Sequence, residues 1–155
     1  MKDRAIRNRK RIAVIGGAKA EKKHLERATA VGRLVAERGA ILVCGGLGGV
    51  MEAACRSAKE AGGLTIGIIP GNDPADANAF VDVPIATGMG YTRNALVVMN
   101  ADAMIAVDGE YGTLSEIAYA CVQGKRIIGL DTWDIKGVER AANPEEAVDL
   151  AMKDR

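Results

Sequence analysis

The sequence predicts an α/β fold: a doubly wound, mostly parallel sheet of about six strands with helices on both faces. Two observations support this prediction. Short apolar runs of strand length alternate with longer segments whose apolar residues recur at helical spacing. Glycine-rich turns follow several of the apolar runs, at the points where a strand would lead into a helix. Because parallel strands need right-handed crossover connections, the expected architecture is a single Rossmann-like domain over residues 1–155.

In the first half of the chain, apolar runs and helical stripes alternate regularly. The expected strands, buried on both faces because they are almost wholly apolar, are residues 11–15, 40–44 and 64–69. The expected helices are residues 21–38, which carry an apolar stripe, and residues 50–61, which are rich in alanine. Gly39 and Gly62 stand where these helices should end.

The next segment continues the pattern less evenly. Residues 70–79 are expected to form an exposed loop, with folding over a ligand or onto a partner subunit as the alternative. A weak strand over residues 81–85 should be short, because Pro84 cannot donate a backbone hydrogen bond. A helix over residues 93–100 should follow Thr92 as its N-cap.

One stretch combines a strand, a glycine turn and a helix start. Residues 104–107 are expected to be a buried strand. Gly109 and Gly112 then turn the chain, and Thr113 is expected to be the N-cap of the next helix. Glu116 follows three residues later, which is the spacing of a capping box.

The end of the chain adds one strand and one helix. Residues 125–130 are expected to be the sixth strand, after a helix that stops at Gly124. Trp133 is expected to cover an edge of the core. The last helix should have Asn143 as its N-cap and Pro144 at its first position.

The glycine-rich turns predict a ligand site. In such sheets, ligands bind beyond the carboxyl ends of the strands, where the strand order reverses. The turns that follow expected strands, and therefore lie on that one edge, are residues 16–17, 45–49, 88–90 and 109–112. The glycines of residues 45–49 exceed the needs of a turn, which indicates close approach by a ligand or another backbone. Arg93 and Glu116 flank this edge and predict an anion-binding, polar pocket of nucleotide size.

Composition limits the class of partner. The net charge of +1 and the aromatic content of 3% argue against nucleic acid and an anionic membrane. Residues 1–10 are interpreted as a basic, solvated leader, with a nucleic-acid-binding arm as the alternative; their cations are Lys2, Arg4, Arg7, Arg9 and Lys10.

No apolar run reaches the length of a membrane span. Three cysteines without a signal peptide indicate free thiols and a cytoplasmic location, and no Cys or His pair has the spacing of metal ligands.

Three sequence blocks resemble a known family. Residues 108–116 (DGEYGTLSE) resemble the P-G-G-x-G-T-x-x-E signature of the LOG ("lonely guy") family. That family sits in a superfamily often labelled "possible lysine decarboxylase", which also holds the molybdenum cofactor carrier proteins. Residues 45–52 (GGLGGVME) and 89–94 (MGYTRN) resemble the other two blocks, in the same order. The likeness extends from about residue 12 to about residue 130.

This resemblance implies one of two functions for the pocket. LOG enzymes hydrolyse the N-glycosidic bond of nucleoside 5′-monophosphates, and the matching positions make Arg93 and Glu116 the catalytic pair. The carrier proteins bind a phosphorylated pterin without converting it. Both branches form oligomers, which implies a homodimer or homotetramer here. The candidate ligand-binding residues are Gly16, Gly17, Gly45, Gly46, Gly48, Gly49, Met51, Glu52, Gly88, Arg93, Asn94, Gly109, Gly112, Thr113 and Glu116.

Two departures from the LOG signature argue against enzymatic activity and favour a related binding role. The segment Asp108-Gly109-Glu110 replaces P-G-G and brings two acids beside the expected phosphate loop, and Asn94 stands where the LOG family has Lys. The carrier proteins resemble this chain more closely in overall length and in residues 87–94 (TGMGYTRN). The resemblance therefore implies a molybdenum cofactor carrier or storage protein, with a phosphoribohydrolase as the alternative. An unidentified nucleotide ligand or a sensor role is the third hypothesis. Lysine decarboxylation is rejected, because no lysine has a context that suggests a pyridoxal Schiff base.

Overall fold

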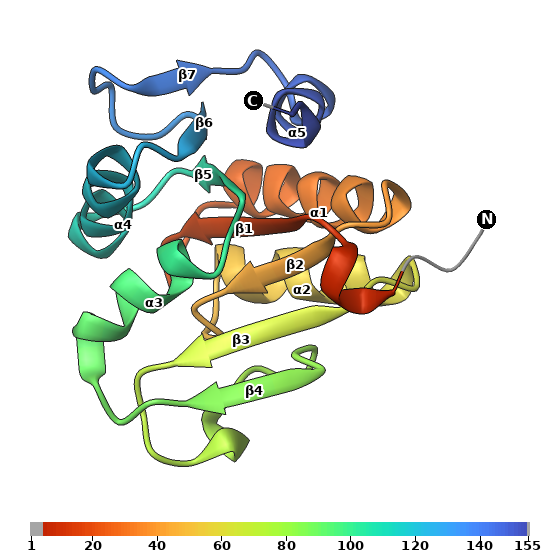
Figure 1. The fold of residues 1–155 in the computed structure, drawn as a ribbon, viewed down its shortest axis with the longest axis vertical. Helices are drawn as coiled ribbons and strands as arrows, with labels where there is room; N and C mark the ends of the chain where they lie inside the picture. Colours follow the sequence, from red (N-terminus) through yellow and green to blue (C-terminus); the bar gives the residue numbers. More distant parts are fainter. Residues whose placement is uncertain (1–4, 155) are drawn as a thin grey trace.

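The computed structural model describes residues 5–154, which form one sheet of seven parallel strands in the order β4-β3-β2-β1-β5-β6-β7 (Figure 1). The strands are β1 (Arg11–Gly16), β2 (Ile41–Cys44), β3 (Thr65–Ile69), β4 (Val83–Ala86), β5 (Ala103–Val107), β6 (Arg126–Leu130) and β7 (Val138–Arg140). The order runs outward from β1 in both directions, so it reverses between β1 and β5. The predicted doubly wound, Rossmann-like α/β class is confirmed.

Helices cover both faces of the sheet (Figure 1). The α-helices are α1 (Lys22–Glu37), α2 (Val50–Glu60), α3 (Asn94–Met99), α4 (Tyr111–Val122) and α5 (Pro144–Met152). The short 3-10 helices are η1 (Ile6–Asn8), η2 (Pro74–Asp76) and η3 (Gly90–Arg93). Side chains of α1, α2 and α5 share one core cluster, and those of α3 and α4 share the other. None of the helices formed by residues 5–154 is long and apolar enough to cross a membrane.

Strand β1 shows why the apolar runs become central strands. Ile12 and Val14 belong to the core cluster under α1, α2 and α5, whereas Ala13 and Ile15 belong to the cluster under α3 and α4. Because successive strand side chains point to opposite faces, a strand covered on both sides must be apolar at every position.

The sheet has one strand more than the sequence predicts. Strand β7 contains only Val-Glu-Arg, is partly exposed and pairs with β6 at the edge of the sheet, so it lacks the apolar run that marks a strand. Strand β4 begins at Val83, two residues later than predicted. Pro84 is tolerated within β4, because β4 is the other edge strand and one of its sides needs no hydrogen-bond donors.

The predicted capping box is wrong. Helix α4 begins at Tyr111 and its N-cap is Glu110, so Thr113 lies inside the first turn. Gly109, with φ of 107°, turns the chain at once after β5, and the helix starts before Thr113 is reached. The side chains of Thr113 and Glu116 are then buried, at 3% and 7% exposure, instead of capping the helix.

Of the other two predicted N-caps, one is wrong and one is confirmed. Thr92 is not an N-cap, because it lies within η3, and α3 begins at Asn94. The prediction for α5 is confirmed: the Asn143 side chain accepts a hydrogen bond of 2.8 Å from the backbone N–H of Glu146, and Pro144 is the first helical residue.

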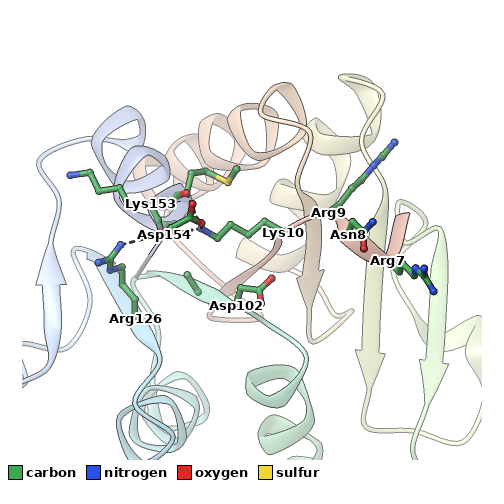
Figure 2. A pocket seen from close by; sticks show the side chains of 11 residues that line it. Arg7, Asn8, Arg9, Lys10, Asp102, Arg126, Lys153 and Asp154 are labelled. Carbon is green, nitrogen blue, oxygen red and sulfur yellow. Dashed lines mark hydrogen bonds and ion pairs between the residues drawn. The ribbon is translucent and has the colours of Figure 1, made fainter. Parts of the chain in front are cut away.

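Basic side chains at the amino-terminal edge of the sheet bind the ends of helices. Lys10 Nζ donates to two carbonyl groups at the end of α5, at 2.8 and 2.9 Å, and contacts Asp154 (Figure 2). Lys125 Nζ donates to three carbonyl groups at the end of α3. Cations at these positions satisfy carbonyl groups that have no partner within the helix. The prediction that the basic side chains of residues 1–10 are solvated is therefore wrong for Lys10, whose ammonium group binds backbone carbonyl groups. Lys2 and Arg4 lie outside the described residues.

Helices α1 and α2 approach closely at Gly32. A Cβ atom at Gly32 would lie 2.1 Å from the Ala54 carbonyl oxygen and 2.4 Å from Ser57 Oγ. We expect Gly32→Ala to lower the free energy of unfolding by about 1–3 kcal/mol, because overpacking outweighs the better helix propensity of alanine. Urea unfolding measures this change, with Thr29→Ala on the exposed face of α1 as the control. Equal or higher stability of Gly32→Ala would contradict the close approach.

Candidate functional site

A cavity of about 340 Å³ lies at the carboxyl ends of β1, β2 and β5, where the strand order reverses. It collects residues from three loops that follow strands, together with η3 and the starts of α2, α3 and α4. The lining residues are Gly16, Gly17, Ala18, Lys19, Gly45, Leu47, Met51, Tyr91, Arg93, Asn94, Glu110, Gly112, Thr113 and Glu116.

A larger cavity, of about 590 Å³, lies at the opposite, amino-terminal edge (Figure 2). It is lined by cations, but Lys10 and Arg126 already bind carbonyl groups at the end of α5. These two cations therefore already interact with carbonyl groups of the protein itself. We therefore place the candidate site in the smaller cavity, to which buried polar side chains and glycine turns contribute.

The structure separates the sequence-predicted residues into two groups. Those that line the cavity are Gly16, Gly17, Gly45, Met51, Arg93, Asn94, Gly112, Thr113 and Glu116. Those that do not line it are Gly46, Gly48, Gly49, Glu52, Gly88 and Gly109. Sequence reasoning did not select five lining residues: Ala18, Lys19, Leu47, Tyr91 and Glu110. Each lies within two residues of a selected glycine or within one of the three blocks, so widening each motif by two residues would have found them.

Some glycines outside the lining are needed for contacts between loops. A Cβ atom at Gly49, whose φ is 61°, would lie 2.2 Å from the Gly17 carbonyl oxygen. A Cβ atom at Gly88 would lie 2.3 Å from Asn72 Oδ1. Close approach by the protein's own chain therefore explains these two positions without a ligand. Glu52 is exposed on α2.

Arg93 is the central cation of the cavity and is 6% exposed. Its Nε donates to the Ile68 carbonyl oxygen at 2.8 Å, and one terminal nitrogen donates to the Gly45 carbonyl oxygen at 3.3 Å. The other terminal nitrogen donates to Asn94 Oδ1. Burial lowers the pKa of the guanidinium, and the negative charge of Glu116 opposes this shift. Because a guanidinium carries five N–H donors, two remain for a ligand.

Glu116 is the acid of the cavity floor, and it is nearly inaccessible to water. Desolvation raises its pKa from 4.5 to about 8, although the charge of Arg93 acts in the opposite direction. At neutral pH the Glu116 carboxyl group is therefore mostly protonated and can donate a hydrogen bond.

The amino terminus of α4 faces the same cavity through Gly112 and Thr113. The side chain of the N-cap residue Glu110 makes no capping hydrogen bond, so the first N–H groups of this helix and its positive dipole end are available to an anion. Arg93 adds a charge, and Lys19 contributes a second one at the rim. The site can thus hold a phosphate group with backbone donors, a guanidinium and an ammonium group.

The two acids before α4 point in different directions. Asp108 has φ of 53° and lies 3.7 Å from His24, measured from Oδ1 to Nε2, and it does not line the cavity. Glu110 lines the cavity and is exposed. One negative charge therefore remains at the rim, on the side of the expected phosphate site.

Comparisons with known proteins agree with this fold. The family model described as SLOG cluster4 matches residues 9–154. Two solved structures cover 92% of this chain. The molybdenum cofactor binding protein of Rippkaea orientalis has a TM-score of 0.88 and 36% identity, over 95% of that chain. The molybdenum cofactor carrier protein of Chlamydomonas reinhardtii has a TM-score of 0.84 and 33% identity, over 96% of that chain.

Several curated relatives carry an enzyme name. The cytokinin riboside 5′-monophosphate phosphoribohydrolase of Mycobacterium marinum is 36% identical over 121 residues, which are 70% of this chain and 63% of that protein. The match therefore spans less than two thirds of the enzyme's length.

Proposed function

The chain belongs to the SLOG cluster4 family, and from this premise we propose that its cavity binds a phosphorylated, nucleotide-like ligand as a molybdenum cofactor carrier or storage protein. One observation carries the proposal. Buried Arg93 and the uncapped start of α4 meet in a cavity at the point where the strand order reverses. The similarity to carrier proteins over nearly their full length supports the identity of the ligand.

The lining suggests how such a ligand would be held. The first N–H groups of α4, Arg93 and Lys19 would bind the phosphate. Leu47, Met51 and Tyr91 offer apolar and aromatic surface to a bicyclic ring. The molybdenum cofactor would thus be the cargo of this protein. A carrier needs only to bind the cofactor and to exclude water from it.

A phosphoribohydrolase is the second candidate, and Glu116 beside Arg93 is the observation that favours it. As a base, Glu116 would have to release its proton, so hydrolysis would increase as the pH rises toward 8. Two features oppose this activity. Glu110 repels a phosphate dianion. Asn94 has a neutral amide, bonded to Arg93 and Ser115, and so supplies no positive charge where the LOG signature has Lys.

The deciding experiment measures base release. The protein is incubated with AMP and GMP between pH 6 and 9, and free base is separated by chromatography, with Glu116→Gln in parallel and Glu52→Gln as the exposed control. We expect no release, together with binding of molybdopterin that slows its oxidation. Release that increases with pH and disappears only in Glu116→Gln would overturn the carrier proposal in favour of the hydrolase.

We further propose that the protein forms a homodimer or homotetramer and is located in the cytoplasm. Exposed apolar side chains offer surface for association: Tyr91 is 85% exposed, Tyr111 78% and Val122 86%. The free cysteines suit a reducing compartment.

A further inference from the structure

Two buried thiols lie in contact beneath the floor of the cavity. Cys44 is the last residue of β2 and Cys55 lies on α2, and both are 0% exposed. Their Sγ atoms are 3.4 Å apart. A disulfide bond is about 2.05 Å long, so the sulfur atoms need to approach by only about 1.4 Å. The third cysteine, Cys121, is exposed on α4.

The two thiols differ in acidity. Hydrogen bonding from Cys55 lowers the pKa of Cys44, a backbone N–H bond of 3.3 Å from Gly46 acts in the same direction, and burial opposes both. The same contact with Cys44, together with burial, raises the pKa of Cys55. Cys44 is thus the more acidic thiol of the pair and is assigned as the nucleophile, and Cys55 is assigned as the resolving thiol.

We propose that Cys44 and Cys55 form a reversible intramolecular disulfide that controls ligand binding in the cavity. With hydrogen peroxide as the oxidant, the Cys44 thiolate attacks one oxygen, the O–O bond breaks, and a sulfenic acid and hydroxide form. The Cys55 sulfur then attacks the Cys44 sulfur, the S–O bond breaks and water leaves. In total, two thiols and one peroxide give one disulfide and two waters. A dithiol reductant reverses the change by thiol–disulfide exchange.

The cavity is coupled to this pair through the residues beside each cysteine. Gly45 follows Cys44, lines the cavity, and accepts the hydrogen bond from Arg93. Met51 lines the cavity one helical turn before Cys55. A Cβ atom at Gly45 would lie 2.8 Å from the Arg93 terminal nitrogen and 2.9 Å from Met51 Sδ, so the floor has no free space.

Closure of the disulfide therefore moves Gly45 against closely packed neighbours. It also removes the Cys44 sulfur from the Gly46 N–H group. The Arg93 guanidinium loses the carbonyl that positions it, and affinity for a phosphate ligand falls. This consequence rests on the proposed binding function, whereas disulfide formation does not.

The first test follows the covalent change alone. The Cys121→Ser protein, which retains only the buried pair, is treated with hydrogen peroxide and analysed by intact mass and thiol titration. We expect a loss of two hydrogen atoms and of both thiols, reversed by dithiothreitol, and no such loss in the Cys44→Ser/Cys121→Ser variant. Retention of both thiols after peroxide treatment, or a loss of thiols that dithiothreitol does not reverse, would overturn the proposal.

The second test measures GMP binding by calorimetry to the reduced and oxidised Cys121→Ser protein. Oxidation should weaken binding by about tenfold or more, the equivalent of one charge-assisted hydrogen bond. The Cys55→Ser/Cys121→Ser variant should keep its affinity after the same treatment. Equal affinity of both redox forms would overturn the coupling to the cavity. Failure of the reduced protein to bind GMP or molybdopterin would instead count against the proposed function, and the mass result would still decide disulfide formation.

Discussion

Arg93→Met is expected to reduce affinity for GMP by about 100-fold, because the ligand phosphate loses its charge-assisted donors. The same substitution should lower the free energy of unfolding by about 1–3 kcal/mol, because buried carbonyl groups are left without their hydrogen-bond donors. The Ile68 and Gly45 carbonyl groups would lose their donors, and Glu116 would lose its neighbouring cation. Calorimetry with GMP and urea unfolding measure the two effects.

Two further variants separate the role of Arg93 from a general loss of charge. Arg93→Lys retains the charge without the planar fork, so it should recover part of the affinity but not all three hydrogen bonds. Arg56→Met makes the same change on the exposed face of α2 and should alter stability by no more than about 0.5 kcal/mol. Wild-type GMP affinity in Arg93→Met would refute the assigned phosphate site.

Glu116→Gln is expected to change how stability depends on pH. In the wild-type protein, the unfolded chain releases the Glu116 proton near pH 4.5, whereas the native state retains it up to about pH 8. The native state therefore holds the extra proton across this window, and stability falls as the pH rises through it. The slope is about 1.4 kcal/mol per pH unit, so the total over this window is on the order of 5 kcal/mol.

Glutamine cannot ionise, so the variant should not show this loss. Compared with the wild type, Glu116→Gln should have similar stability below pH 4.5 and should become progressively more stable up to about pH 8, with a constant difference above it. Urea unfolding at pH 4, 6, 8 and 9 gives the difference, in which all other titrating groups cancel. Parallel curves for the two proteins would show that Glu116 is not desolvated.

The sequence predicted the fold class and the edge that carries the site, because both depend on local patterns. Apolar runs such as residues 104–107 are recognisable without their neighbours, and a glycine turn after a parallel strand must lie at the carboxyl edge. That reasoning also brought Arg93 and Glu116 to one place. It did not detect β7, since three residues at an edge carry no periodic signal.

Contacts between distant segments decided the rest. Thr113 and Glu116 have the spacing of a capping box, but packing against the sheet buried both and started the helix earlier. The raised pKa of Glu116 is a result of desolvation, which no sequence pattern records. The Cys44–Cys55 contact joins a strand to the helix beneath it, and side-chain direction there depends on how α2 lies on β2. The sequence by itself determined which elements form and on which edge their turns meet, whereas burial and side-chain direction arose only when those elements packed together.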